Sequence, residues 1–375
     1  MADHVLERLL DSPGEWTFVY TDGRGAEPAP AERTRQRSLG DTLRDAGAPE
    51  SDRDAVDGAL SQGAGVPSPS VRYLLVRNGA VELDETFPGS RLGPQIIGHG
   101  PVPPVLPLLR ERATDSRYLV VETAREGARI SVEHAHRRVG DESHEIEGRT
   151  DSLPKVQAGG WSHKRYQMHT EDVWKHNQDE VAAEVDELVR TRRPKFVVVT
   201  GDVRARQLLA EQLAPATRSI LIEVDEHTKA AGSSDAALQD AVGDALDELA
   251  NSDISEVRDR ASADDGSRGA RGVPDVVRAL QESRVDTLLL DARAVNSDET
   301  LLALDAAPWI ATSGEDSLDA NVLGAVSAAE ALARAAVLTG ARVLVAEDEL
   351  DADEPRPDRA IAPPMAALRW GGEEG

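Results

Sequence analysis

The chain contains no cysteine among its 375 residues. This absence excludes disulfide bonds, zinc sites built from thiolates and a cysteine nucleophile. No uninterrupted apolar run reaches the roughly eighteen residues of a membrane-spanning helix. The first four residues, Met1-Ala2-Asp3-His4, carry an acid where a secretory signal would carry Lys or Arg. Together these absences predict a cytoplasmic protein without a membrane partner.

Lysine is also scarce, because only five lysines stand beside 37 arginines. The formal net charge is −26, which by itself argues against a nucleic-acid partner. A dense coat of carboxylates with few lysines is typical of a cytoplasm at molar salt, where self-repulsion is screened within about 3 Å. We therefore expect a halophilic, archaeal protein; a GC-rich genome, which also replaces Lys by Arg, is the alternative. At such salt phosphate affinity is weak, so RNA binding would depend on stacking and shape.

One stretch, Ser152–Thr170, has no acidic residue at all. It contains Gly159-Gly160-Trp161-Ser162-His163-Lys164-Arg165, here called the Gly-Gly element. The two glycines allow a sharp bend or a close approach to another surface. The indole, hydroxyl, imidazole, ammonium and guanidinium that follow suit contact with folded RNA by stacking and phosphate pairing. The alternative is a plain hinge before a helix, with Trp161 packed in a core.

The length predicts two or three domains, and the pattern along the chain favours three. Residues 1–112 have the alternation of an N-terminal α+β domain. Asn78-Gly79 between two alternating runs is a strong hairpin signal. Four prolines, Pro101, Pro103, Pro104 and Pro107, predict a stiff connector at its end. The expected elements are strands at Trp16–Tyr20, Val71–Arg77 and Ala80–Glu85, and helices at Arg33–Gly47 and Ser51–Leu60.

Residues 113–255 predict a middle domain with an RNase H-like mixed sheet. Three meandering strands come first, and the Gly-Gly element then leads into a long amphipathic helix. Strands and helices alternate after that. The expected strands are Tyr118–Val121, Ala128–Val132, Glu145–Glu147, Lys195–Thr200 and Ser219–Glu223, and the later helices are Arg204–Leu213 and Ala236–Leu249.

Residues 256–375 predict a small C-terminal α/β/α sandwich. Its first part, Asp259–Gly272, has the composition of a disordered linker. The expected elements that follow are helices at Pro274–Glu282 and Val322–Leu338 and strands at Thr287–Leu290 and Arg342–Val345.

The sequence predicts no metal site and no cofactor. Six histidines lie between His134 and His176, but they lack the spacing of a zinc-binding helix and are better explained as solvated side chains. The run Gly201-Asp202-Val203-Arg204 follows a strand but fits neither a phosphate-binding nor a dinucleotide-binding loop. We expect Asp202 to cap a helix instead. Glu122 and Asp202 alone are too few acids for a two-metal nuclease.

The order of these features resembles a known family. A Gly-Gly-x-Ser sequence, Arg165, a long helix and then Phe196-Val197-Val198-Val199-Thr200-Gly201-Asp202 follow the pattern of the superfamily of archaeal and eukaryotic peptide-release factors and Pelota. The chain is most similar to its prokaryotic branch, which includes Balon-like hibernation factors and relatives of the Vms-type peptidyl-tRNA hydrolases. The resemblance implies a Pelota-like C-terminal domain. It also implies the ribosome as partner, with large-subunit RNA and the A site contacted, and tRNA and an elongation-factor GTPase as further partners, but no DNA.

The chain departs from the release factors at one position. They carry Gly-Gly-Gln, whose glutamine helps to place the attacking water, whereas here Trp161 follows the glycines. Gln157 and Gln167 are close in sequence, but neither matches the spacing. The resemblance therefore implies a non-hydrolytic A-site factor for hibernation or stress protection, whose Gly-Gly element contacts RNA. The alternatives are a Vms-type peptidyl-tRNA hydrolase that rescues stalled chains, and a small-molecule or metal-binding protein unrelated to ribosomes.

Overall fold

The structure is a computed structural model. It describes residues 3–12, 14–23, 29–62, 66, 68–114, 116–124, 126–135, 142–147, 162–224, 233–262, 268–347 and 361–370. The chain divides into two compact units. Unit 1 comprises residues 1–114 together with 251–375, and unit 2 comprises residues 115–250. Each unit combines helices with β-sheets, so the predicted mixed α/β class is confirmed. The division into three domains stays a prediction.

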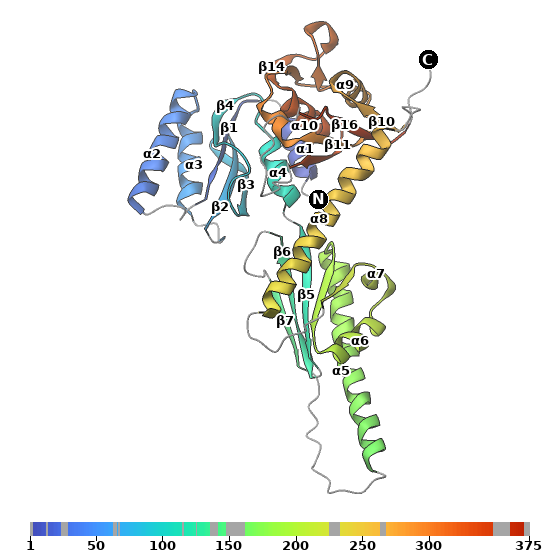
Figure 1. Cartoon of the computed structure of the whole chain (residues 1–375). Coiled ribbons are helices and arrows are strands. Elements are labelled where there is room, and N and C mark those ends of the chain that lie inside the picture. The colour runs from blue at the N-terminus through green and yellow to red at the C-terminus, as the bar shows by residue number, and fades with distance from the viewer. Residues whose placement is uncertain are drawn as a thin grey trace. The chain divides into compact units, whose positions relative to one another are not determined.

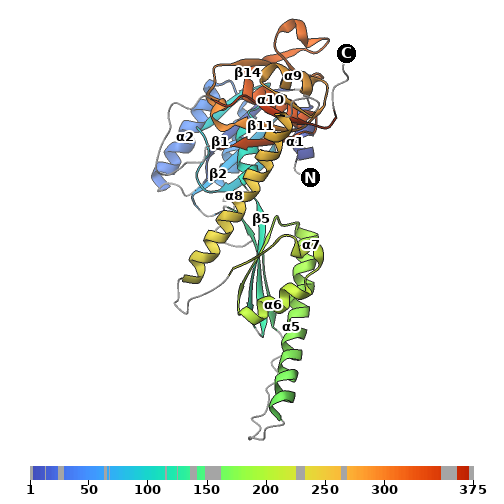
Figure 2. The ribbon, with the colours of Figure 1, turned by 45° about the vertical axis from the view of Figure 1, so that its right-hand side comes forward.

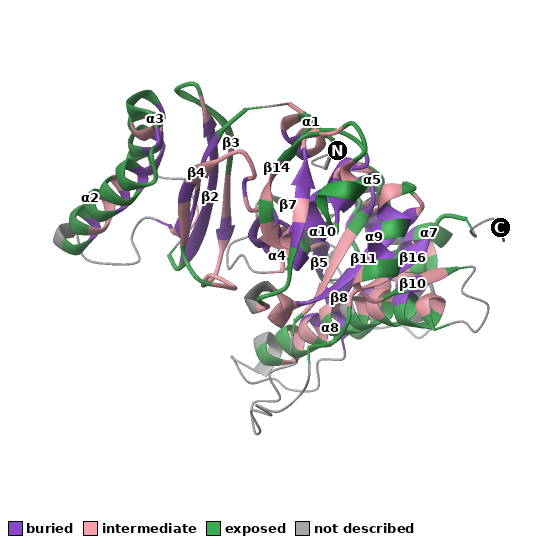
Figure 3. Cartoon of the chain, turned by 90° about the horizontal axis from the view of Figure 1, so that it is seen from above, coloured by how far each residue is buried: buried purple, intermediate pink, exposed green. Residues whose placement is uncertain are grey.

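The first part of unit 1 is a four-stranded antiparallel sheet with helices on one face (Figure 1). The order of the strands is β3-β2-β1-β4. Helices α2 and α3 pack on the sheet through Leu43 and Val56, which meet Val19 and Leu74. Strand β2 is buried along nearly its whole length (Figure 3). The elements are α1 Asp3–Leu10, β1 Trp16–Asp22, α2 Ala29–Asp45, α3 Glu50–Ser61, β2 Ser70–Arg77, β3 Ala80–Pro88, β4 Ile96–Gly100 and α4 Leu106–Thr114.

The last part of unit 1 contains two further sheets. One has the order β10-β16-β11-β15 and the other β13-β12-β14. The larger sheet meets α9 and α10 through Leu288 and Leu290, while its other face meets the end of α8 through Val257. This is the predicted α/β/α arrangement. The elements are the end of α8 Ser233–Ala261, β10 Gly269–Arg271, α9 Val273–Gln281, β11 Val285–Asp291, β12 Thr300–Leu304, β13 Ile310–Ala311, β14 Val322–Ser327, α10 Ala328–Leu338, β15 Arg342–Ala346 and β16 Met365–Leu368, with 3-10 turns at Ala292–Asn296 and Gly314–Ser317.

The two parts of unit 1 share one hydrophobic core. Leu6 of α1 and Leu106 of α4 belong to the same buried cluster as Leu332 of α10. All residues of α10 except Glu330 are buried. Ion pairing supports the same junction, because Arg110 of α4 donates to both carboxylate oxygens of Glu347 at 2.8 and 2.6 Å. The first and last segments of the chain therefore stabilise each other.

Unit 2 has the sheet order β7-β6-β5-β8-β9. Strands β5, β6 and β7 are antiparallel, whereas β8 and β9 run parallel to β5. Helix α5 covers one face through Val181 and Val185, and the first part of α8 covers the other through Val242. The predicted RNase H-like order is confirmed. The elements are β5 Arg117–Ala124, β6 Gly127–His134, β7 Glu142–Glu147, α5 Ser162–Arg192, β8 Val197–Gly201, α6 Val203–Gln212, α7 Pro215–Arg218 and β9 Leu221–Glu223.

Three predictions about elements were wrong. The predicted helix Val322–Leu338 is strand β14 followed by α10, and the Ser327 hydroxyl caps the helix by accepting from the Glu330 N–H. The predicted linker Asp259–Gly272 begins with the last turn of α8 and ends with strand β10, and Gly269 lies against the backbone of Ala261. Its residues 263–267 lie outside the described residues. The proline connector ends in a helix, because α4 begins at Leu106 and accommodates Pro107 in its first turn.

Candidate functional site

The Gly-Gly element lies at the start of α5. Gly159, Gly160 and Trp161 lie outside the described residues, so their contacts with RNA stay a prediction. Ser162, His163, Lys164 and Arg165 form the first turn of α5, of which the backbone is described. A long helix was predicted to follow the Gly-Gly element; it begins within the element, at Ser162.

Helix α5 is 31 residues long, which corresponds to about 46 Å. Val181, Val185 and Leu188 are buried against the sheet, and burial of the described side chains begins at Asn177. Figures 1 and 2 both show the N-terminal part of α5 continuing past the end of the sheet. The C-terminal half of the helix is therefore an anchor, and the half nearest the Gly-Gly element projects from unit 2.

A buried glutamine fixes the point where α5 leaves the sheet. Gln178 is fully buried, and its side-chain N–H donates to the Ala124 carbonyl at 2.9 Å. Its side-chain oxygen accepts from the Thr123 hydroxyl at 3.0 Å. Because a buried amide without partners is costly, these two bonds hold the helix in one register on β5. The sequence reasoning missed Gln178, whose signal was a polar residue inside the apolar stripe of α5.

Helix α6 begins at the same end of the sheet. Gly201 has φ of +113°, and a Cβ on it would lie 2.0 Å from the Thr123 carbonyl oxygen. The Asp202 N–H donates to that carbonyl at 3.0 Å. The Asp202 carboxylate then accepts from the N–H groups of Arg204 and Ala205 at 3.0 and 3.1 Å. The prediction that Asp202 is a helix cap is confirmed, and this carboxylate is occupied by its own helix.

The other residues considered for catalysis do not form a site. Glu122 is exposed and pairs in register with Thr200, so it lies on the strand beside β8, which ends just before Asp202. His144 lies 3.2 Å from Glu184, and exposed His176 lies 3.5 Å from Glu180. Among the residues that the structure describes, no three His, Asp or Glu side chains could hold one metal ion.

Burial changes the pKa of one tyrosine of this unit, Tyr118. Tyr118 stacks on Phe196 with ring centroids 5.0 Å apart and an angle of 9° between the rings. Burial, reinforced by the carboxylate of Glu133, raises the pKa of Tyr118 to about 12. The phenol therefore stays protonated and acts as part of the core.

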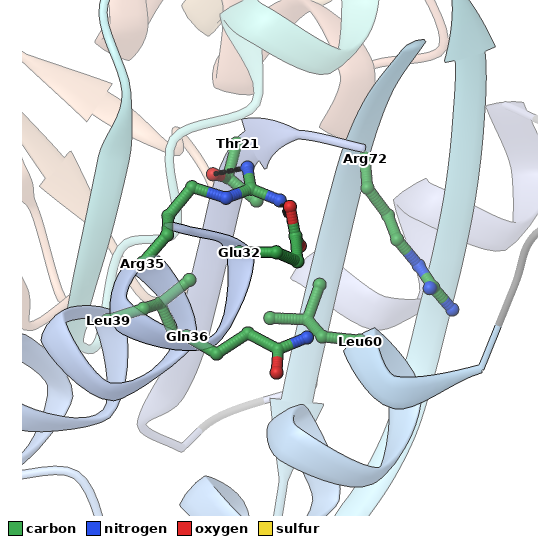
Figure 4. Close-up of a pocket in the computed structure, with 7 residues that line it drawn as sticks. All are labelled: Thr21, Glu32, Arg35, Gln36, Leu39, Leu60 and Arg72. Carbon is green, nitrogen blue, oxygen red and sulfur yellow. Dashed lines mark hydrogen bonds and ion pairs between the residues drawn. The ribbon is translucent and has the colours of Figure 1, made fainter. Parts of the chain in front are cut away.

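Unit 1 has a small cavity between α2 and the sheet (Figure 4). Two of its charged groups neutralise each other, because the Arg35 guanidinium lies 2.6 Å from Glu32; Arg35 also donates to the Asp22 carbonyl at 2.6 Å. Thr21 accepts from Gln95 at 2.7 Å. These contacts hold α2 on β1. The lining residues are Thr21, Glu32, Arg35, Gln36, Leu39, Leu60 and Arg72.

No helix formed by the described residues combines the length and apolar composition needed to cross a membrane.

The central part of the chain matches the model of a known protein family. Residues 117–267 match the model of the bacterial archaeo-eukaryotic release factor family 2. The match includes the Gly-Gly element, α5, β8 and Asp202, which are the features from which the superfamily was predicted. The resemblance to archaeo-eukaryotic release factors is therefore confirmed for this stretch. No curated protein matches the chain.

Several solved structures are similar over most of their length. An archaeal translation termination factor, aRF1, is 17% identical, with 98% of this chain and 97% of that chain covered and a TM-score of 0.24. Dom34 of S. cerevisiae, a translation termination-like factor, is 12% identical, with 82% of each chain covered and a TM-score of 0.44. Ribosome-bound archaeal Pelota is 12% identical, with 99% and 94% covered and a TM-score of 0.39. Because all three TM-scores are below 0.5, the likeness over the whole chain is weak.

Proposed function

We propose that the chain is a translation factor of the release-factor and Pelota type that binds the ribosomal A site without cleaving an ester. The family match over residues 117–267 is the observation that carries this proposal. Two features of unit 2 support it. The anchored half of α5 gives a rigid base, and the projecting half would carry the Gly-Gly element toward large-subunit RNA, where Trp161 stacks on a base. The protein would then act in the cytoplasm as a hibernation or stress-protection factor, with tRNA and a GTPase as further partners.

Ribosome binding is tested by sedimentation. Purified protein is mixed with ribosomes of the source cell, separated on sucrose gradients at low and at molar KCl, and detected in each fraction. We expect it with whole ribosomes and large subunits. Its absence from these fractions at both salt concentrations, including in lysates of starved cells, would refute the proposal.

A peptidyl-tRNA hydrolase is the second candidate, because Gln157 and Gln167 flank the glycines. Ester hydrolysis needs a water positioned against the carbonyl, and much of the rate comes from that positioning. The indole of Trp161 donates one hydrogen bond and accepts none, so it cannot replace the glutamine amide of the release factors. We therefore expect no release of labelled peptide from stalled ribosome complexes above the spontaneous rate. Release that is lost in Gln157→Ala or Gln167→Ala would establish the hydrolase instead.

A further inference from the structure

The densest positive charge of this acidic chain lies at the opposite end of α5 from the Gly-Gly element. Residues 190–195 contain four cations and no acid. Arg192 is the last residue of α5, and Arg193 follows with φ of +50°, which ends the helix before Pro194. Lys195 then precedes strand β8.

Arg117 joins these cations from the neighbouring strand. Strands β5 and β8 are parallel, with Leu119 beside Val197 in register, and the Lys195 N–H donates to the Arg117 carbonyl at 2.8 Å. Because side chains alternate along a strand, Arg117 and Lys195 share the face that α5 covers. The Arg117 guanidinium donates to the Arg192 carbonyl at 2.9 Å. Arg117, Arg192, Arg193 and Lys195 therefore form one cluster, here called the cationic edge.

The carboxylates nearest in sequence do not pair with Arg193 or Lys195. Glu187 pairs with Arg190 at 2.5 Å. Asp186 accepts from the Thr217 hydroxyl at 2.5 Å and from the Ala214 N–H at 3.1 Å. Arg193 and Lys195 are exposed, and neither forms an ion pair with any described residue. Their charges face solvent.

Helix stability does not account for the whole cluster. Cations in the last turn of a helix offset its dipole, which explains Arg190 and Arg192. The Arg117 guanidinium also supports the helix end, because it donates to the Arg192 carbonyl. Arg193 and Lys195 lie beyond the helix, where the effect of the dipole fades, so these two charges need another explanation.

We infer that the cationic edge binds the sugar-phosphate backbone of RNA. This inference rests on the proposed function and adds to it a second RNA contact, separated from the Gly-Gly element by the roughly 46 Å of α5. Guanidinium and ammonium groups pair with phosphate oxygens, the former through two parallel hydrogen bonds.

The surroundings of the cationic edge favour RNA over an acidic protein. Pro194, Phe196 and Tyr118, the large apolar residues beside it, are all buried. A protein partner would find no exposed apolar anchor of the kind that dominates protein interfaces. Backbone binding to RNA needs none, since charge and counterion release supply the affinity.

The test compares the full chain with two matched triple variants. Arg192→Gln/Arg193→Gln/Lys195→Gln removes three charges of the cationic edge and keeps Arg117, which bonds the backbone. The control, Arg258→Gln/Arg271→Gln/Arg278→Gln, removes three exposed charges from unit 1. Binding to ribosomes and to an RNA duplex of arbitrary sequence is measured by fluorescence anisotropy across a KCl series, and melting followed by circular dichroism verifies that each variant is folded.

Each phosphate contact contributes about 0.7–0.9 to the slope of the logarithm of the binding constant against log[KCl]. The first variant removes three cations, so its slope should be smaller in magnitude by about two. Affinity near 100 mM KCl should fall by about ten- to a hundredfold, and the control should match the wild type. An unchanged slope in the first variant, or an equal loss in the control, overturns the inference. Polyglutamate, an acidic polypeptide, is tested in the same assay. A first variant that loses polyglutamate binding but keeps RNA binding also overturns the inference.

The two proposals fail differently. If wild-type protein does not bind ribosomes, the proposed function fails, while the duplex measurement still decides whether the cationic edge binds RNA. If wild-type protein binds ribosomes and the first variant binds with the same affinity and salt slope, only the cationic edge is refuted.

Discussion

Thr123 makes the hydrogen bonds that position two helices of unit 2. Its carbonyl accepts from the Asp202 N–H, its hydroxyl donates to Gln178, and the next carbonyl also accepts from Gln178. Gly201 makes this possible, because only a residue without a side chain can pass the Thr123 carbonyl with φ of +113°. One strand residue therefore sets the positions of both α5 and α6.

Gly201→Ala tests this close approach. The added methyl would lie 2.0 Å from the Thr123 oxygen, so the backbone must shift and the free energy of unfolding should fall by about 2–4 kcal/mol. Gly243→Ala is the control, since that glycine lies in α8 with no atom within 4 Å of the added carbon. It should raise stability by about 0.5–1 kcal/mol. Urea unfolding measures both, and equal effects would contradict the argument.

Trp161→Ala tests the proposed stacking on RNA. Loss of one base–aromatic stack should weaken ribosome binding by about 1–3 kcal/mol, without a change in melting temperature. Trp370→Ala is the control, because Trp370 is 54% exposed in unit 1. It should leave the affinity unchanged. A lower melting temperature with normal affinity would place Trp161 in a core.

Helix α10 connects the first and last parts of unit 1 through a buried carboxylate. Glu330 is in its first turn and accepts from the N–H groups of Val105 and Leu106, at the start of α4. Burial raises the pKa of Glu330 to about 7, although these two donors lower it. The carboxyl group of Glu330 therefore gains its charge near neutral pH in the folded protein, well above the pH at which an exposed glutamate does.

Glu330→Gln should change how stability depends on pH. Because the folded pKa lies above the unfolded value of 4.5, the contribution of Glu330 is complete below about pH 4.5 and is lost as the pH rises through about 7. The loss is at most roughly 3 kcal/mol. Gln cannot ionise, so the difference in unfolding free energy between wild type and variant should shift in favour of the variant across this range. Urea titrations at several pH values measure it, with exposed Glu315→Gln as control; a constant difference would rule out the titration of Glu330.

Elements with their own local signal could be predicted from the sequence. Asn78-Gly79 indicated the β2–β3 hairpin, and Asp202 indicated the start of α6. Elements defined by a distant partner could not. Val322–Ser327 is a strand because it pairs with β12, and its apolar run alone fits a helix equally well. Gln178 was missed for the same reason, since its importance depends on Thr123, a residue far away in sequence.

At the scale of the whole molecule, we expect the two units to unfold in two separate cooperative transitions. Leu6→Ala removes a fully buried side chain of α1 from the core that it shares with α10, and should cost about 2–5 kcal/mol. We expect hydrogen exchange to accelerate in both 1–114 and 251–375 and not in 115–250. Leu209→Ala, equally buried in unit 2, should give the converse pattern. Faster exchange in 1–114 alone after Leu6→Ala would show that the two parts of unit 1 fold separately.

Unit 1 is built from the first and the last segment of the chain. During synthesis it therefore cannot be completed until the last segment has been made. Helices α1 and α4 leave the exit tunnel early, but α10, on which they pack, follows α4 only after roughly 200 residues, or about 10–40 s at about 5–20 residues per second. Unit 2 is a continuous segment and can fold within that interval. Until α10 has been synthesised, Leu6 and Leu106 lack this packing partner and their apolar surfaces are exposed. The nascent chain is therefore most prone to aggregate at the stage when unit 2 is already folded.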